Sequence, residues 1–269
     1  MTVRPRWYVS FDVPASGGRL SCVTTRQKIL ITGASSGLGE GMAREFAARG
    51  RSLALAARRV DRLETLADEL RPSASQVAVS ALDVTDVDAV PVVFGKLRDE
   101  LGGLDRVIVN AGLGKGAPIG TGKAHANIET VQTNLVGALA QAEAAMEIFR
   151  AQNHGHLVLV SSISGIRGLP KAQTAYSASK AGVTAIGQGL QAELVNSPIT
   201  VSVVAPGYIE TDINRGVKTA LMADTESGVA AMVKAIEAEN GYSPVPAWPW
   251  TPIAAALKYL PGFVTRRMI

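Results

Sequence analysis

The chain has 269 residues, of which 47% are apolar, and a formal net charge of +4. This length and composition support one large buried core and argue against disorder. The basic residues are dispersed, with no run of five or more, so the charge pattern gives no support to a nucleic-acid partner. No stretch of 18 or more apolar residues occurs, so we expect no transmembrane helix. The single cysteine, Cys22, fits a reducing compartment, and we expect a cytoplasmic protein.

The first 27 residues carry no sustained periodicity and are interrupted by Pro5, Pro14 and Gly17. Their apolar stretches are too broken for a signal peptide. We interpret residues 1–27 as an irregular arm, or as the product of a mistaken start site with the natural chain beginning near Val23.

From Lys28 onward, apolar runs alternate with segments of helical periodicity. Nearly continuous runs of Val, Ile and Leu are typical of parallel strands that are buried on both faces. We expect strands over residues 28–33, 52–58, 77–84, 106–111, 156–161 and 200–205, and helices over residues 39–49, 60–70, 86–101 and 127–150 and after Tyr176. The helix over 127–150 carries an apolar stripe formed by Val131, Leu135, Leu139, Ala142, Met146 and Phe149.

Alternating strands and helices predict an α/β fold, a Rossmann-like doubly wound parallel sheet of about seven strands with helices on both faces. We expect a single domain over residues 28–240 and an apolar tail over residues 241–269. In such folds the ligand binds in the crevice at the carboxyl ends of the strands. The polar motifs of this chain follow those ends.

The first strand leads into a glycine-rich turn with the spacing GxxxGxG, which differs from the general GxGxxG pattern. Glycine permits a tight turn and a close approach of the backbone to a ligand, and the next helix directs its N-terminal N–H groups at the same spot. The turn therefore predicts a pyrophosphate site formed by Gly33, Ser35, Ser36, Gly37, Leu38 and Gly39.

Arg58 and Arg59 follow the second strand, where this kind of fold meets the adenosine ribose. An acid there binds the 2′-hydroxyl of NAD, whereas an arginine accommodates the 2′-phosphate of NADP. The acid Asp61 lies beyond the strand end, so we expect both arginines to bind a cofactor and NADP(H) to be favoured over NAD(H). After the third strand, Asp83 either accepts a hydrogen bond from adenine, beside Val84, or caps the next helix.

Small and polar residues also follow the later strands. A serine hydroxyl at a strand end, as in Ser161-Ser162, can bind a substrate carbonyl and stabilise the oxyanion that forms. Asn110 can tie neighbouring strands together, and Asn134 is either exposed on its helix or faces the crevice. We expect further cofactor contacts from Asn110, Ala111, Gly112, Pro206, Gly207, Ile209 and Thr211.

The segment Tyr176-Ser177-Ala178-Ser179-Lys180 places a phenol and an ammonium on one face of a helix. A nearby positive charge favours phenolate and lowers the pKa of the phenol. The pair therefore predicts a proton donor and acceptor beside a hydride-transfer cofactor. We also expect both residues to bind that cofactor. The histidines at 125, 154 and 156 show no ligand spacing, so we place them in loops and expect no metal site.

Together, the glycine turn, Asn110-Ala111-Gly112, Asn134, Ser161-Ser162, the YSASK segment and Pro206-Gly207 resemble the short-chain dehydrogenase/reductase family, in its form of about 250 residues. Reductases of 3-oxoacyl groups and other hydrophobic ketones are most similar. The resemblance implies that Tyr176 is the general acid in reduction and that Lys180 lowers its pKa and holds the nicotinamide ribose. It also implies that Ser162 orients the carbonyl and that Asn134 holds a water in a proton relay.

One departure from the family pattern concerns the serine, which usually lies 13 residues before the tyrosine, where this chain has Ile163. Ser162 lies 14 residues and Ser164 lies 12 residues before Tyr176. A one-residue insertion in the loop that precedes Tyr176 favours Ser162, because a loop tolerates an extra residue better than a strand end does.

The tail contains Thr251-Pro252, typical of a helix N-cap followed by the first helical position, and a short apolar segment over 253–260. We expect the tail to pack on the domain or on a partner subunit. The alternative is that the tail forms a wall of an apolar substrate pocket or contacts a membrane surface. The loop over 208–224 suggests an apolar lid.

We therefore predict an NADP(H)-dependent oxidoreductase that interconverts a ketone or aldehyde and an alcohol on a small hydrophobic substrate, such as a 3-oxoacyl, steroid or retinoid-like compound. The alternative is a non-catalytic NADP-binding redox sensor, which has no need of a proton donor. The family resemblance also implies a homodimer or homotetramer, assembled through the helices that carry Asn134 and Tyr176.

Overall fold

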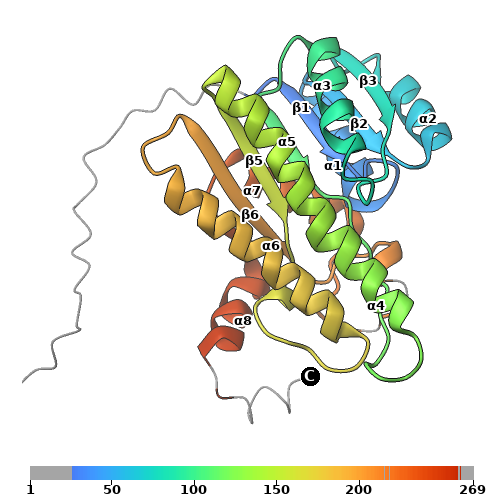
Figure 1. Cartoon of the computed structure of the whole chain (residues 1–269), viewed down its shortest axis with the longest axis vertical. Coiled ribbons are helices and arrows are strands. Elements are labelled where there is room, and N and C mark those ends of the chain that lie inside the picture. The colour runs from blue at the N-terminus through green and yellow to red at the C-terminus, as the bar shows by residue number, and fades with distance from the viewer. Residues whose placement is uncertain (1–25, 215, 218, 260, 262–269) are drawn as a thin grey trace, which may run out of the picture.

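The strands of the chain form one parallel sheet in a computed structural model that describes residues 26–214, 216, 217, 219–259 and 261 (Figure 1). Its strand order is β3-β2-β1-β4-β5-β6-β7. The strands are β1 (Lys28–Thr32), β2 (Ser52–Ala57), β3 (Gln76–Ala81), β4 (Arg106–Val109), β5 (Gly155–Val160), β6 (Ile199–Pro206) and β7 (Tyr242–Val245). The doubly wound Rossmann-like sheet is therefore confirmed. Most of the arm expected over residues 1–27 lies outside the described residues, as do residues 262–269.

Helices cover both faces of the sheet. They are α1 (Gly37–Ala48), α2 (Val60–Leu70), α3 (Ala89–Leu101), α4 (Ala124–Val131), α5 (Gly137–Gln152), α6 (Gln173–Glu193), α7 (Thr225–Glu237) and α8 (Ala247–Tyr259). Side chains of α3, α5 and α6 share one buried core with the sheet, and side chains of α1, α2 and α7 share the other. Each strand sends alternate residues into the two cores, which explains the continuous apolar runs in the sequence. The chain reverses its winding direction between β1 and β4, at the topological switch point.

The seventh strand lies in the segment that the sequence assigned to the tail. β7 pairs in parallel with β6, from Val203 opposite Tyr242 to Pro206 opposite Val245. It contains Pro244, which cannot donate a backbone hydrogen bond, and it occupies the edge of the sheet, where proline is tolerated. Because proline is unusual in a strand, the sequence pattern did not predict β7. The pairing of β7 with β6 extends the sheet beyond the domain end expected at residue 240.

The single helix expected over 127–150 is interrupted. A π-helical turn, η1 (Gln132–Val136), separates α4 from α5, and such turns frequently occur at functional sites. The apolar stripe is also only partly internal, because Leu139 is 44% exposed while Ala142, Met146 and Phe149 are buried. The expected helix start at Thr251 is wrong as well, since α8 begins at Ala247 and bends at Trp248.

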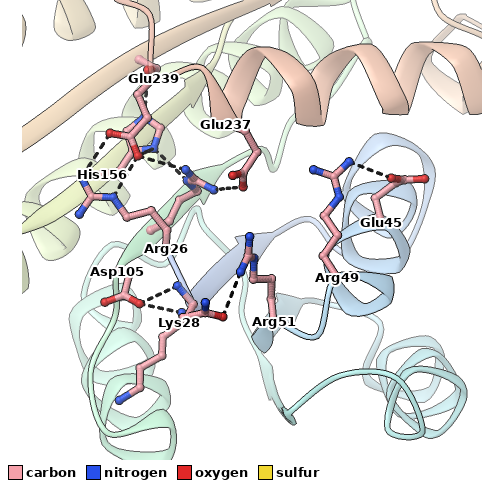
Figure 2. A network of polar contacts seen from close by, with 12 residues as sticks. Arg26, Lys28, Glu45, Arg49, Arg51, Asp105, His156, Glu237 and Glu239 are labelled. Carbon is pink, nitrogen blue, oxygen red and sulfur yellow. Dashed lines mark hydrogen bonds and ion pairs between the residues drawn. The ribbon is translucent and has the colours of Figure 1, made fainter. Parts of the chain in front are cut away.

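A buried polar network joins the amino ends of the central strands to the end of α7, on the side opposite the crevice (Figure 2). Arg106, the first residue of β4, donates to the carboxylates of Glu237 at 2.6 Å and Glu239 at 3.2 Å. Its Nε donates to Nδ1 of His156 at 2.9 Å, and Arg26 pairs with Glu239. The expectation of three loop histidines is therefore wrong, since His156 is buried within β5 and the histidine at 125 lies in α4.

Candidate active site

Most of the residues expected to bind a cofactor converge on a cleft of about 560 Å³ at the carboxyl edge of the sheet. Gly33 adopts a φ of +64°, and a Cβ there would lie 2.9 Å from the Cα of Ala111, so the turn requires glycine at this position. α1 begins at Gly37 with no side-chain cap from Ser36, which leaves its first N–H groups available to an anion. The cleft is lined by Gly33, Ser35, Ser36, Gly37, Leu38, Arg58, Arg59, Asp83, Val84, Asn110, Ala111, Gly112 and Thr211. This set fits a dinucleotide.

The two arginines after β2 point to different partners. Arg59 lies over the glycine turn and donates to the Oγ of Ser35 at 3.0 Å and to the Oγ of Ser36 at 2.6 Å. Arg58 is exposed and lies 4.0 Å from a carboxylate oxygen of Asp83. The structure therefore gathers Arg59 and two hydroxyls into one cluster, with Arg58 at its margin.

Asp83 forms a local turn and also lines the cleft. Its Oδ1 accepts hydrogen bonds from the backbone N–H and the hydroxyl of Thr85. Burial alone would raise the pKa of the Asp83 carboxyl, but the bonds from Thr85 and the charge of Arg58 outweigh it and lower the pKa below its usual value. Asp83 does not cap the next helix, because α3 begins at Ala89, whose N–H is accepted by Asp86.

Two asparagines fix the loops around the cleft. The Nδ2 of Asn110 donates to the carbonyl of Thr32 at 2.9 Å, which confirms that this side chain ties β4 to β1. Asn134, in η1, is buried: its Oδ1 accepts from the N–H of Leu113 at 2.7 Å and its Nδ2 donates to the carbonyl of Leu113 at 2.9 Å. Asn134 therefore holds the loop after β4, and neither it nor Gly39 lines the cleft directly.

Tyr176 and Lys180 both come from α6 and line a second cavity of about 590 Å³, which adjoins the cleft and includes Ser162 and Ser164. The Nζ of Lys180 lies 6.0 Å from the centre of the Tyr176 ring and donates to the carbonyl of Val160 at 2.8 Å. Ser162 is buried, and its Oγ donates to the carbonyl of Pro206 at 3.4 Å. Its hydroxyl is close enough to the Tyr176 phenol to lower the pKa of that phenol. Its Oγ also accepts from the N–H of Ser164 at 3.1 Å.

The expected effect of Lys180 on Tyr176 does not occur in the structure. Burial raises the pKa of the Tyr176 phenol, and the nearby Ser162 hydroxyl only partly offsets this rise. Burial also lowers the pKa of Lys180 to about 8, because a charged ammonium is poorly solvated there. Sequence reasoning placed the two groups on one helix face correctly, but it could not include the loss of water around both of them.

The second cavity is mostly apolar where it extends away from Tyr176. Pro206, Gly207, Ile209 and Thr211 line it, and of these four Thr211 also lines the cofactor cleft. The sequence did not identify several apolar lining residues as site residues, among them Ile163, Leu169, Val217, Leu221, Trp250, Ile253 and Leu257. In the sequence, the apolar loop over 208–224 pointed to Val217 and Leu221, and the tryptophans of the tail pointed to Trp250.

The described residues contain no group of three or more side chains that could hold a metal ion. Within the same part of the chain, no helix is long and apolar enough to cross a membrane.

A phosphate-cradling turn and a half-buried tyrosine beside a buried lysine, at the same sheet edge, define a dinucleotide-dependent oxidoreductase, and comparisons with known proteins agree. The model of the short-chain dehydrogenase family matches residues 27–222. An uncharacterized oxidoreductase of Mycobacterium tuberculosis is 55% identical over 246 residues, which cover 90% of this chain and 97% of that protein.

Two solved structures are also similar. Levodione reductase is 25% identical with a TM-score of 0.75, over 84% of this chain and 98% of that chain. An alcohol dehydrogenase from the archaeon Thermococcus sibiricus, complexed with 5-hydroxy-NADP, is 26% identical with a TM-score of 0.71, over 81% and 94% of the two chains. The chain belongs to the short-chain dehydrogenase family and is an NAD(P)-dependent enzyme of that family.

Proposed function

We propose that the protein is an NADP(H)-dependent reductase of neutral, apolar ketones or aldehydes, which also runs in reverse on the matching alcohols. The observation that carries this proposal is that Ser162, Tyr176 and Lys180 line one cavity together with many apolar side chains. The cavity opens beside the glycine turn, so a carbonyl held there lies next to the cofactor cleft.

In the proposed reaction, Ser162 donates a hydrogen bond to the substrate carbonyl oxygen, and Tyr176 gives that oxygen its proton. The cofactor, when bound, supplies the hydride. Ser162 is favoured over Ser164 because its hydroxyl is buried and lowers the pKa of the Tyr176 phenol, whereas the backbone N–H of Ser164 donates to that hydroxyl and orients it. Burial raises the pKa of Tyr176 and so keeps the phenol in the protonated form that reduction uses, and we assign to the charge of Lys180 the stabilisation of the phenolate that remains.

Lys180 and Asn134 complete the proposed proton path. Lys180 is held by the carbonyl of Val160 with its ammonium beside Gly112, where it can contact the ribose of a bound cofactor. Asn134 fixes the loop that contains Gly112 and Leu113, and we assign to it the support of a water that returns protons to Lys180.

The preference for NADP(H) rests on the cluster of Arg59, Ser35 and Ser36 at the adenosine end of the cleft. A guanidinium with two hydroxyls offers the charge-assisted hydrogen bonds that a 2′-phosphate accepts. No carboxylate competes inside this cluster, and the nearby Asp83 is engaged by Thr85. Arg58 adds positive charge from the margin.

The apolar lining of the second cavity favours a small hydrophobic substrate. Exposed apolar side chains on one surface of the protein favour assembly into a homodimer or homotetramer. Ile128, Val136 and Leu139 are exposed on the connected elements α4, η1 and α5. Exposed apolar clusters of this kind mark interfaces, and the same surface is the family's expected subunit contact. A non-catalytic redox sensor is not favoured, because it gives no reason for gathering Ser162, Tyr176 and Lys180 around one cavity.

The proposal is tested by mixing the purified protein with NADPH or NADH and a panel of methyl ketones, aryl ketones, aldehydes and 3-oxoacyl thioesters. We expect turnover of the neutral apolar carbonyls, with NADPH preferred. Arg59→Glu should lower the NADPH/NADH ratio of kcat/KM by about tenfold or more, because a charge-assisted pair is lost, and Arg58→Glu should lower it less. Absence of turnover with every carbonyl and both coenzymes would contradict the proposed function.

A further inference from the structure

α8 packs apart from the two main cores of the domain. Its buried residues, Trp250 and Ala254, form a small separate cluster with Ile163 and Ala205. Ile163 follows Ser162 directly, and Ala205 lies at the carboxyl end of β6. The helix therefore covers the exits of the two strands that flank the catalytic groups (Figure 1).

The indole of Trp250 packs directly against the backbone of Gly207, where any other residue would place a side chain. A Cβ at Gly207 would overlap the indole ring, so the missing side chain makes the space that the ring fills. The indole also meets the ring of Tyr208 edge to face, with 5.6 Å between ring centres. Trp250 is 4% exposed, whereas Trp248, two residues earlier, is 80% exposed. The chain thus offers a buried tryptophan and an exposed one side by side.

α8 is held at its other end as well. The Nη1 of Arg167 donates to the carbonyl of Leu257 at 3.2 Å. This carbonyl belongs to the last turn of the helix, where carbonyl groups lack a partner within the helix. Contacts near both ends make α8 a fixed wall with a defined position relative to Ser162 and Tyr176.

The wall faces the cavity that contains the catalytic groups. Trp250, Ile253 and Leu257 line it from α8. Tyr208 also lines it, contacts Trp250 and is close enough to Tyr176 to influence the ionisation of that phenol. Among the described residues that line this cavity, Lys180 is the one charged side chain, and it is held by Val160. The region beside α8 therefore suits a neutral apolar substituent of the substrate.

We propose that Trp250 is the specificity-determining residue of the substrate pocket, with its indole setting the length of the apolar substituent that fits beside α8. The inference rests on the proposed function for its substrate class. It goes further by naming the residue and the helix that select among apolar carbonyl compounds.

Binding can be measured without turnover, by the displacement of N-phenyl-1-naphthylamine, a neutral dye that fluoresces in apolar pockets, with 2-alkanols of increasing chain length. For the wild-type protein, affinity should rise by about fourfold for each added CH2 until the chain meets the indole, and should then stop rising. Trp250→Leu should continue the rise to longer alkanols. Trp248→Leu, the matched control, should stop at the wild-type length.

A second variant and a second assay keep the outcome decisive. If Trp250→Leu does not fold, Trp250→Phe, which retains an aromatic ring, should shift the limit by a smaller amount in the same direction. The same limit in wild type and in the Trp250 variants, or an equal shift in Trp248→Leu, would overturn the proposal. Reduction of the matching 2-alkanones with NADPH is measured in parallel. A length limit that moves in binding without any turnover would refute the proposed function and leave the role of Trp250 standing.

Discussion

His156 should make the stability of this protein depend on pH in a window where few of its other groups titrate. The imidazole of His156 (Figure 2) is fully buried in β5. Its Nδ1 accepts from Arg106, and its Nε2 lies within hydrogen-bond distance of the Ser202 hydroxyl. Because Nδ1 accepts, the ring is neutral and a proton would break its bond to Arg106. Burial first, and then the charge of Arg106, lower the pKa of His156 to about 3, although Glu239 acts in the opposite direction.

The sign and size of the effect follow from linkage between protonation and folding. The unfolded chain binds a proton at this histidine below the ordinary imidazole pKa of 6.5, while the folded chain does not until its pKa of about 3. The contribution of His156 is therefore fully present above pH 6.5 and is lost as pH falls. One proton corresponds to about 1.4 kcal/mol per pH unit, so the free energy of unfolding should fall by about 3 kcal/mol from pH 6.5 to 4.5. Below that range Glu239 also contributes, because its folded pKa is lowered to about 2.

The assay is urea unfolding followed by circular dichroism at fixed protein concentration, in steps of pH from 7.5 to 4.5. His156→Gln retains an oxygen acceptor for Arg106 and removes the titrating group, so it should flatten the slope even if it lowers stability at pH 7.5. His154→Gln, at an exposed neighbouring histidine, should keep the wild-type slope. A flat wild-type profile, or an unchanged slope in His156→Gln, would refute the reasoning.

Two further predictions concern the cofactor turn and the subunit surface. In Gly39→Ala the new Cβ would meet the carbonyl of Gly33 and the Nδ2 of Asn110, so NADPH affinity measured by nucleotide fluorescence should fall by about tenfold or more. Gly95→Ala, at a helical glycine with open space around it, should bind NADPH as the wild type does, and equal affinity in both variants would contradict the turn assignment. Leu139→Glu should lower the molar mass in light scattering to that of a smaller assembly, because it places a charge in the expected interface. Val92→Glu, at an exposed apolar position on α3, should leave the molar mass unchanged. An unchanged mass for Leu139→Glu would exclude the surface around Leu139 as the subunit interface.

The sequence predicted the parts of this fold that depend on local pattern. Six strands follow from continuous apolar runs, and α2 begins and ends at the expected residues, Val60 and Leu70. The seventh strand was missed because Pro244 is unusual in a strand, and its pairing with β6 is a long-range contact that no local pattern reveals.

The site was predicted in the same uneven way. The order of the motifs identified the strand exits, so Tyr176, Lys180 and the glycine turn meet where expected. The distinct roles of Arg58 and Arg59 depend on side-chain directions, which the sequence does not contain. The raised pKa of Tyr176 depends on burial, and the Arg106 network depends on partners more than 100 residues away, such as Glu237.

The central claim is that Tyr176 transfers the proton, and one comparison tests it most directly. Tyr176→Phe and wild type are loaded with NADPH, and single-turnover reduction of the best ketone of the panel is followed by the loss of nicotinamide absorbance. We predict unchanged NADPH affinity and a rate lower by about 10²- to 10⁴-fold, the usual contribution of a positioned general acid. Tyr259→Phe, at an exposed tyrosine of α8, should react at the wild-type rate. A Tyr176→Phe protein that binds NADPH and reduces the ketone as fast as wild type would contradict the account.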